Sequence, residues 1–191
     1  MEETGSYLGP LQLVGGVWGF GDATRPDTHW VEVRPDGLRQ HVPGSAGRSV
    51  PWNRIMTGIW ITWGNQSWSA DGRGVYTLKG TVAPGVSGWM RMTLRHPYED
   101  DQLRFDQHTR PYRAVDALRL EYLLRHLVAH EELPLLGDPQ WVGRAVAHLG
   151  REQSRWTTYR SLRRSGAEAV AAAGAAGRRP GAVCAPEDEG A

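Results

Sequence analysis

The chain has 191 residues, a formal net charge of +1 and a single cysteine, Cys184. A net charge so close to zero does not point to nucleic acid or a membrane surface as a partner of the whole molecule. One cysteine excludes both a disulfide framework and a multi-cysteine zinc site within the chain. Neither a secretory signal nor a run of about 18 apolar residues is visible, so we expect a cytoplasmic protein without a transmembrane segment.

Arginine supplies all but one of the 22 basic residues, the exception being Lys79. With the excess of alanine and glycine, this is typical of a GC-rich genome of the actinobacterial kind. We therefore attribute the arginine content to mutational bias more than to function. The basic excess is confined to the last third of the chain, where residues 141–191 carry eight basic and five acidic side chains.

The first hundred residues are predicted to form antiparallel strands joined by short Gly/Pro turns. Residues 29–33 place Val31 and Val33 on one face, and residues 34–37 (RPDG) form a turn in which Gly37 adopts a positive φ. The next strand turns three side chains inward, namely Leu38, Gln40 and Val42. Residues 43–49 are a loop, and residues 89–96 alternate, with Met90, Met92 and Leu94 pointing inward. Such half-buried strands favour an antiparallel sheet.

Four tryptophans lie between residues 52 and 68: Trp52, Trp60, Trp63 and Trp68. β-Branched and aromatic residues predict one long strand here, with its odd positions from Ile55 to Trp63 facing the core. Trp60 then lies on the opposite face, and Trp30 likewise opposes the inward valines of its own strand. Aromatic residues on an outer sheet face either support packed helices or line a ligand groove. We favour cover by helices, and retain Trp30 and Trp60 as a candidate aromatic surface.

The pattern changes after residue 96. Residues 96–112 are predicted to be a polar loop, and residues 113–132 a helix that is apolar almost all round and therefore widely buried. Asp138 and Pro139 predict the start of a second helix with an apolar face. A third helix is expected over residues 151–172, followed by a low-complexity, disordered end.

The strand order and two short motifs resemble the bacterial pleckstrin-homology-like domains. The motifs are VEVRPDGLR (residues 31–39) and SVPWNRI (residues 49–55), separated by a loop and followed by a helix. The resemblance implies an α+β fold, an antiparallel β-sandwich or partly open barrel capped by a helix, and a non-catalytic binding or assembly role. We accordingly divide the chain into a PH-like domain (residues 11–132), a helical extension (133–174) and a disordered tail (175–191).

Two groups of titratable residues are candidates for metal or acid–base chemistry. His126 and His130 lie four residues apart on the predicted helix, but the glutamate of H-E-x-x-H is missing between them. The loop before that helix carries an acidic and histidine cluster: His96, Glu99, Asp100, Asp101, Asp106 and His108. Converging carboxylates and histidines could bind a cation in a small metal-dependent enzyme. Their spacing matches no metal motif, so we favour solvated side chains.

The expected third helix carries arginines interleaved with Trp156 and Tyr159: Arg151, Arg155, Arg160, Arg163 and Arg164. Such a pattern can bind phosphates, bases or an anionic lipid surface. It also fits a solvated face in an arginine-rich protein.

The leading prediction is a non-catalytic binding or assembly module that contacts a protein or an anionic ligand. No nucleotide-binding or hydrolase motif occurs, so no catalytic, cofactor-binding or metal-ligating residue and no cofactor is assigned. The metal-dependent enzyme and a nucleic-acid or membrane contact through the Arg151–Arg164 segment remain alternatives.

Overall fold

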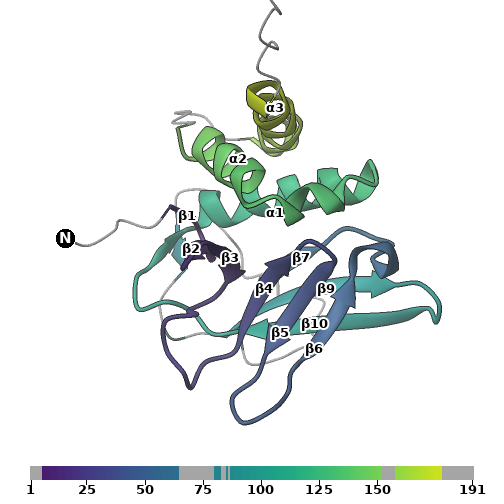
Figure 1. The fold of residues 1–191 in the computed structure, drawn as a ribbon. Helices are drawn as coiled ribbons and strands as arrows, with labels where there is room; N and C mark the ends of the chain where they lie inside the picture. Colours follow the sequence, from purple (N-terminus) through teal and green to yellow (C-terminus); the bar gives the residue numbers. More distant parts are fainter. Residues whose placement is uncertain (1–5, 65–79, 83–84, 86, 152–157, 178–191) are drawn as a thin grey trace, which may run out of the picture.

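The computed structural model describes residues 6–64, 80–82, 85, 87–151 and 158–177 (Figure 1). Within these ranges the chain forms antiparallel sheets that do not close into a barrel, together with three α-helices that lie together on one side of them. The predicted α+β class is therefore confirmed. No α-helix in the described part is long and apolar enough to cross a membrane.

Six strands in sequence order form the first sheet. They are β1 (Tyr7–Leu8), β2 (Leu11–Val14), β3 (Val17–Phe20), β4 (Trp30–Arg34), β5 (Gly37–His41) and β6 (Arg48–Pro51). The predicted inward residues Val31, Val33, Leu38 and Gln40 are buried, which confirms the alternation. Val42 follows the end of β5 and is half-buried.

Gly37 closes the hairpin between β4 and β5 opposite Arg34, but the positive φ that we predicted for it is wrong. Glycine is needed here for a different reason. A Cβ atom at this position would lie 2.2 Å from the carbonyl oxygen of Val50 on β6. The close approach of the next strand, and not the turn conformation, therefore requires a residue without a side chain.

The remaining strands form two smaller antiparallel sheets, in the orders β10-β9-β7 and β11-β8. Their bounds are β7 (Trp60–Trp63), β8 (Thr81–Val82), β9 (Gly88–Leu94), β10 (Glu99–Phe105) and β11 (Tyr112–Arg113). Met90, Met92 and Leu94 are buried, as the alternation in this segment predicts.

The prediction of a polar loop over residues 96–112 is wrong for β10. All seven residues of β10, from Glu99 to Phe105, pair with β9. Leu103 and Phe105 are fully buried and anchor the strand, while its acidic start stays at the surface beside arginines of other segments. The acidic residues at the start of β10 obscure the strand pattern, because every second side chain is buried only in the second half of the strand.

The single long strand predicted through the tryptophans is also wrong. β6 ends at Pro51, a short 3-10 turn covers Trp52–Arg54, and β7 begins only at Trp60. Trp52 is buried, and its Nε1–H donates to the carbonyl oxygen of Pro35 at 3.1 Å. The odd-numbered isoleucines of this segment are nevertheless buried, as predicted, and Trp68 lies outside the described residues.

The helices are α1 (Ala114–Ala129), α2 (Pro139–Arg151) and α3 (Tyr159–Gly177), with a 3-10 segment at Leu133–Gly137. The predicted start of α2 is confirmed, because the backbone N–H of Gln140 donates to Asp138 Oδ1 at 2.9 Å. The predicted third helix over residues 151–172 is misplaced. Arg151 ends α2, since Gly150 does not interrupt it, and α3 continues to Gly177, inside the segment predicted to be disordered.

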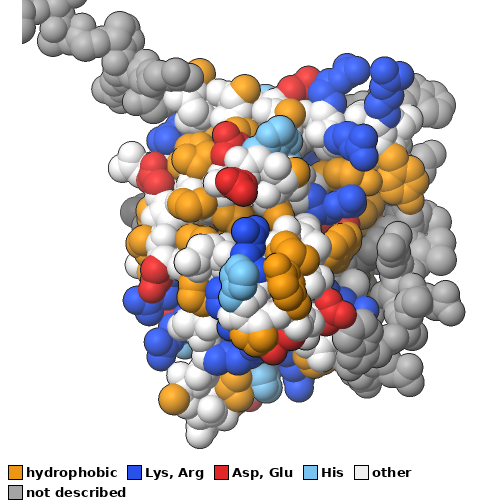
Figure 2. Space-filling model, turned by 90° about the vertical axis from the view of Figure 1, so that its right-hand side faces the viewer, with side chains coloured by type: hydrophobic (Ala, Val, Ile, Leu, Met, Phe, Trp, Pro, Cys, Tyr) orange, Lys and Arg blue, Asp and Glu red, His pale blue; other side chains and the backbone are white. Residues whose placement is uncertain are grey.

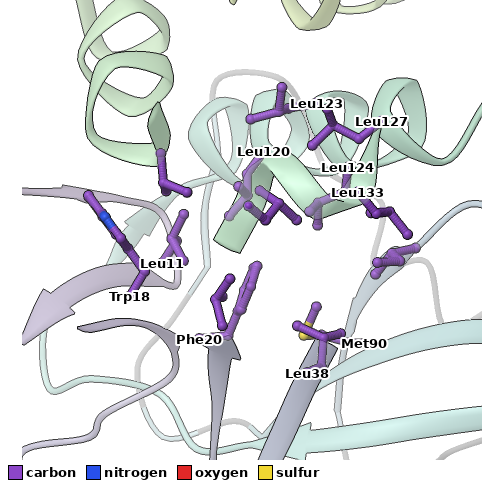
Figure 3. Packing of buried hydrophobic residues seen from close by; sticks show 14 of the residues in the cluster. Leu11, Trp18, Phe20, Leu38, Met90, Leu120, Leu123, Leu124, Leu127 and Leu133 are labelled. Carbon is purple, nitrogen blue, oxygen red and sulfur yellow. The ribbon is translucent and has the colours of Figure 1, made fainter. Parts of the chain in front are cut away.

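Helix α1 lies at the centre of the core (Figure 3). Its leucines, including Leu120 and Leu124, lie above Phe20 and Met90 of the sheets. On its other side α1 packs against α3 and α2. Even Arg119 of α1 is only 3% exposed, which confirms that this helix is buried widely.

Two glycine-to-alanine substitutions test this packing. In Gly88→Ala, the new methyl carbon would lie 2.2 Å from the buried ring of Phe105, so we expect a loss of about 1–3 kcal/mol in the free energy of unfolding. Gly143→Ala, in the interior of α2, is the matched control. Its Cβ would meet Trp18 at an ordinary 3.8 Å, and the helix should gain up to about 1 kcal/mol. Urea unfolding of both variants measures the difference, and equal stabilities would contradict the packing at Phe105.

Candidate functional site

Three of the predicted arginines form an exposed face on α3. Arg160, Arg163 and Arg164 are exposed, while Leu162 and Ala169 on the opposite side of the helix are buried. Within the described residues, none of the three arginines makes an ion pair. Basic side chains gather in the upper right of Figure 2, on the side of the molecule where α3 lies. We call these three residues the basic face.

Of the other two predicted arginines, neither is a described residue of α3. Arg151 belongs to α2, where its Nε–H donates to the carbonyl oxygen of Ala147 at 3.0 Å. Arg155 lies outside the described residues. The prediction of one arginine-lined helix from residue 151 to 164 is therefore wrong, because α2 and α3 are separate helices.

Trp60 lies beside α1, close to two aromatic and basic side chains of that helix. The guanidinium carbon of Arg125 is 5.9 Å from the centre of the Trp60 ring and 5.0 Å from that of Tyr122. Arg125 also pairs with Glu121 at 3.8 Å. Trp60 is half-buried, so α1 covers part of this outer sheet position.

Trp30 packs on its own sheet. Its ring stacks on that of His41, with centroids 4.0 Å apart and planes within 3° of parallel. His41 Nε2 in turn lies 2.7 Å from Glu32 Oε2. Trp30 and Trp60 thus have different neighbours, and we treat them as separate positions and not as one aromatic surface.

The acidic residues of the predicted metal loop are engaged separately. Asp101 pairs with Arg48 at 2.6 Å, Glu99 pairs with Arg54 at 2.9 Å, and Asp100 accepts a hydrogen bond from Thr93 at 2.9 Å. Asp106 lies further along, against His29 and Arg104, and His96 packs beside the ring of Tyr98. The described part of the chain holds no group of three or more histidine, cysteine or acidic residues arranged to bind a metal.

The two helical histidines lie against each other. The ring centroids of His126 and His130 are 4.2 Å apart. Partial burial, and then the neighbouring His130, lower the pKa of His126. Two histidines in contact with no glutamate between them in the sequence do not make a metal site of the H-E-x-x-H type.

His108 is enclosed, unlike the other members of the predicted loop. It is 6% exposed, and its Nδ1 lies 2.6 Å from the hydroxyl of Tyr112, whose oxygen also accepts the backbone N–H of His108. Burial, reinforced by the charge of Arg110, lowers the pKa of His108 to about 4. Burial raises the pKa of Tyr112 to about 12. At neutral pH both side chains are therefore neutral and serve as a buried hydrogen-bonded pair.

The low pKa of His108 predicts acid sensitivity. The folded protein keeps this ring neutral down to about pH 4, whereas the unfolded chain takes up a proton below about pH 6.5. Since the unfolded state then binds more protons, the free energy of unfolding should fall between pH 6.5 and pH 4, by up to about 3 kcal/mol. His108→Gln should flatten this part of the pH profile in urea unfolding. An NMR titration of the folded protein that places the His108 pKa near 6.5 would contradict this prediction.

The chain has no match among protein-family models, curated proteins or solved structures. The resemblance to bacterial pleckstrin-homology-like domains therefore stays a prediction that rests on the residues themselves. Function has to be inferred from the surfaces and contacts described above.

Proposed function

We propose that the protein is a non-catalytic binding module, in which residues 11–132 form a PH-like domain and the helices after it contact the partner. Two features support the PH-like assignment. Antiparallel strands precede α1 in the chain, and α1 covers them as a capping helix would. A protein fold does not determine a function, so the binding role rests on the surface chemistry of α3.

The observation that carries the proposal is the positive charge of the basic face, which no acidic side chain of the described residues neutralises in an ion pair. Arg160, Arg163 and Arg164 project from the side of α3 that does not pack on the core. Guanidinium groups present planar pairs of N–H donors that match carboxylates, and they carry a positive charge at every physiological pH. Tyr159, which is 68% exposed, stands next to them and offers an aromatic contact of the kind common in protein interfaces.

An acidic segment of another protein is the partner that fits this surface best. The basic face is small and compact, which suits a few carboxylates. A surface for nucleic acid ordinarily neutralises about 6–10 phosphates, and attachment to a membrane needs a larger basic or apolar area. Nucleic acid and anionic lipid are therefore the alternatives to be tested beside it.

The metal-dependent enzyme has less support. Glu99 and Asp101 are already neutralised by arginines from other segments, which leaves their charges unavailable without breaking those pairs. Asp106 is likewise held between His29 and Arg104.

A double substitution tests the basic face. The protein should bind a short poly-glutamate peptide in fluorescence anisotropy, with an affinity that falls as salt is added. Arg163→Gln/Arg164→Gln should weaken binding about tenfold, because two exposed charge pairs contribute about 1 kcal/mol each at most. Arg34→Gln/Arg39→Gln, on the β4–β5 hairpin, removes the same charge elsewhere and should leave the affinity unchanged.

Three outcomes would contradict the proposal. Equal losses in both double variants would show that binding depends on net charge alone. Absence of peptide binding even at low salt would remove the acidic protein partner. Binding to a DNA duplex or to phosphatidylserine vesicles, but not to the peptide, would show that the basic face contacts nucleic acid or anionic lipid instead.

A further inference from the structure

A second polar region lies where the two larger sheets meet, and the basic face plays no part in it. Backbone hydrogen bonds join the segments there: the N–H of Asp106, just after β10, donates to His29 O at 2.7 Å, and the N–H of Asp22, just after β3, donates to Asp106 O at 3.0 Å. The end of β10 is therefore fixed between the end of β3 and the start of β4. Side chains from segments distant in sequence are held together at this junction.

A solvent-open pocket of about 280 Å³ lies here, lined by residues of these segments together with Gly85 and Ser87. This volume is close to the lower end of the range of small-molecule sites, about 300–1,000 Å³, so the ligand that it can take is small. The side chains that the argument uses are those of Arg25, Asp27, Thr28, Arg104, Asp106 and Gln107.

Both arginines of the pocket are fixed in place by carboxylates. Arg25 Nε donates to Asp22 Oδ2 at 2.8 Å, and its Nη2 donates to Gln107 O at 3.0 Å. Arg104 donates to Asp106 Oδ1 from Nε at 3.2 Å and from Nη2 at 2.9 Å. Each guanidinium thus has one nitrogen, Nη1, with no bond to another residue of the described part. Each Nη1 therefore retains its N–H donors for an acceptor group.

Asp27 supplies the opposite charge. Its side chain is exposed and makes no ion pair within the described residues. Asp106 is also negative at neutral pH: burial alone would raise its pKa, but the hydrogen bonds from His29 and Arg104 outweigh burial and lower the pKa. With Arg25 and Arg104 positive and Asp27 and Asp106 negative, the lining has no net charge. A polyanion would be repelled by the carboxylates, and a simple cation by the guanidinium groups.

The pocket also borders on a buried polar residue. Gln107 is 5% exposed, and neither its amide nitrogen nor its amide oxygen has a hydrogen-bond partner within the described residues. An unpaired buried polar group costs about 1–3 kcal/mol. The lining residues are polar or charged apart from Gly85, and this favours a polar ligand over an apolar one.

We propose that this pocket binds a small zwitterion of the size of a free amino acid. The ligand carboxylate lies on the Nη1 donors of Arg25 and Arg104, and the ligand ammonium group pairs with Asp27. This assignment uses both signs of charge in the lining and is independent of the proposed function of the basic face. If the pocket binds no amino acid, the proposed function of the basic face is unaffected. If the basic face binds no acidic peptide, the proposal for the pocket is unaffected.

The test is a titration of the full chain with each proteinogenic amino acid, followed by ligand-observed NMR and calorimetry. At least one amino acid should bind. Its N-acetyl derivative lacks the ammonium group, its carboxamide lacks the carboxylate, and each should bind about tenfold more weakly, as expected for the loss of one charge-assisted contact. Asp27→Asn should weaken the amino acid about tenfold as well, but should not weaken the N-acetyl derivative further.

The control variant is Asp36→Asn, which makes the same chemical change in an exposed turn away from the pocket and should bind like the unaltered protein. Arg163→Gln/Arg164→Gln should also bind the amino acid normally, which separates this site from the basic face. Absence of binding by every amino acid at millimolar concentration would overturn the proposal. Equal affinities for the amino acid and its N-acetyl derivative would also overturn the proposal. This comparison uses only the unaltered protein, so it does not depend on the folding of a variant.

Discussion

The rest of the structure depends on the burial of α1 from two sides. Leu118, Arg119 and Leu124 are all buried although, at about 100° per residue, they point to three different sides of α1, and no single sheet could cover all of them. The sheets cover one side, and α2 and α3 cover the other (Figure 1). Removal of either layer would expose leucine side chains, each of which contributes about 1.5–3 kcal/mol when buried. The helices after α1 therefore contribute residues to the same hydrophobic core as the sheets.

The same constraint positions the basic face. Gly166 of α3 lies directly on the backbone of α1, where a Cβ atom would come within 2.9 Å of Tyr122 O. Ala169 and Ala173 continue the small-residue contact along α3, and both are fully buried. Because small residues turn this side of α3 towards α1, the arginines on its other side must face outward. The basic face is thus oriented by core packing, although none of its residues belongs to the core.

The sequence predicts secondary-structure elements best where a local residue pattern is enough to determine the element. The alternation around Met90 and the N-cap at Asp138 are local signals, and both are confirmed. The strand β10 was missed because its first residues are acidic and are stabilised by arginines on β6 and on the turn before β7, which a reading of neighbouring residues cannot detect. The pocket was missed for the same reason: Arg25 and Arg104 are 79 positions apart, and they are brought together by the backbone bonds of Asp106 and by the bond from Arg25 to Gln107 O. Part of the signal for β10 is present in the sequence, since Leu103 and Phe105 keep the two-residue period of a strand.

The place of α1 in the chain has a consequence for biosynthesis. A ribosome makes the sheet residues that α1 covers, from Leu8 to Phe105, before Ala114 and the leucines that follow it. Chains are synthesised at about 5–20 residues per second, so the apolar sheet surface stays uncovered for seconds while the helices are still being made. Folding of the whole chain waits for the last third, and the nascent sheet is the stage at which the protein is most exposed to aggregation or to capture by a chaperone.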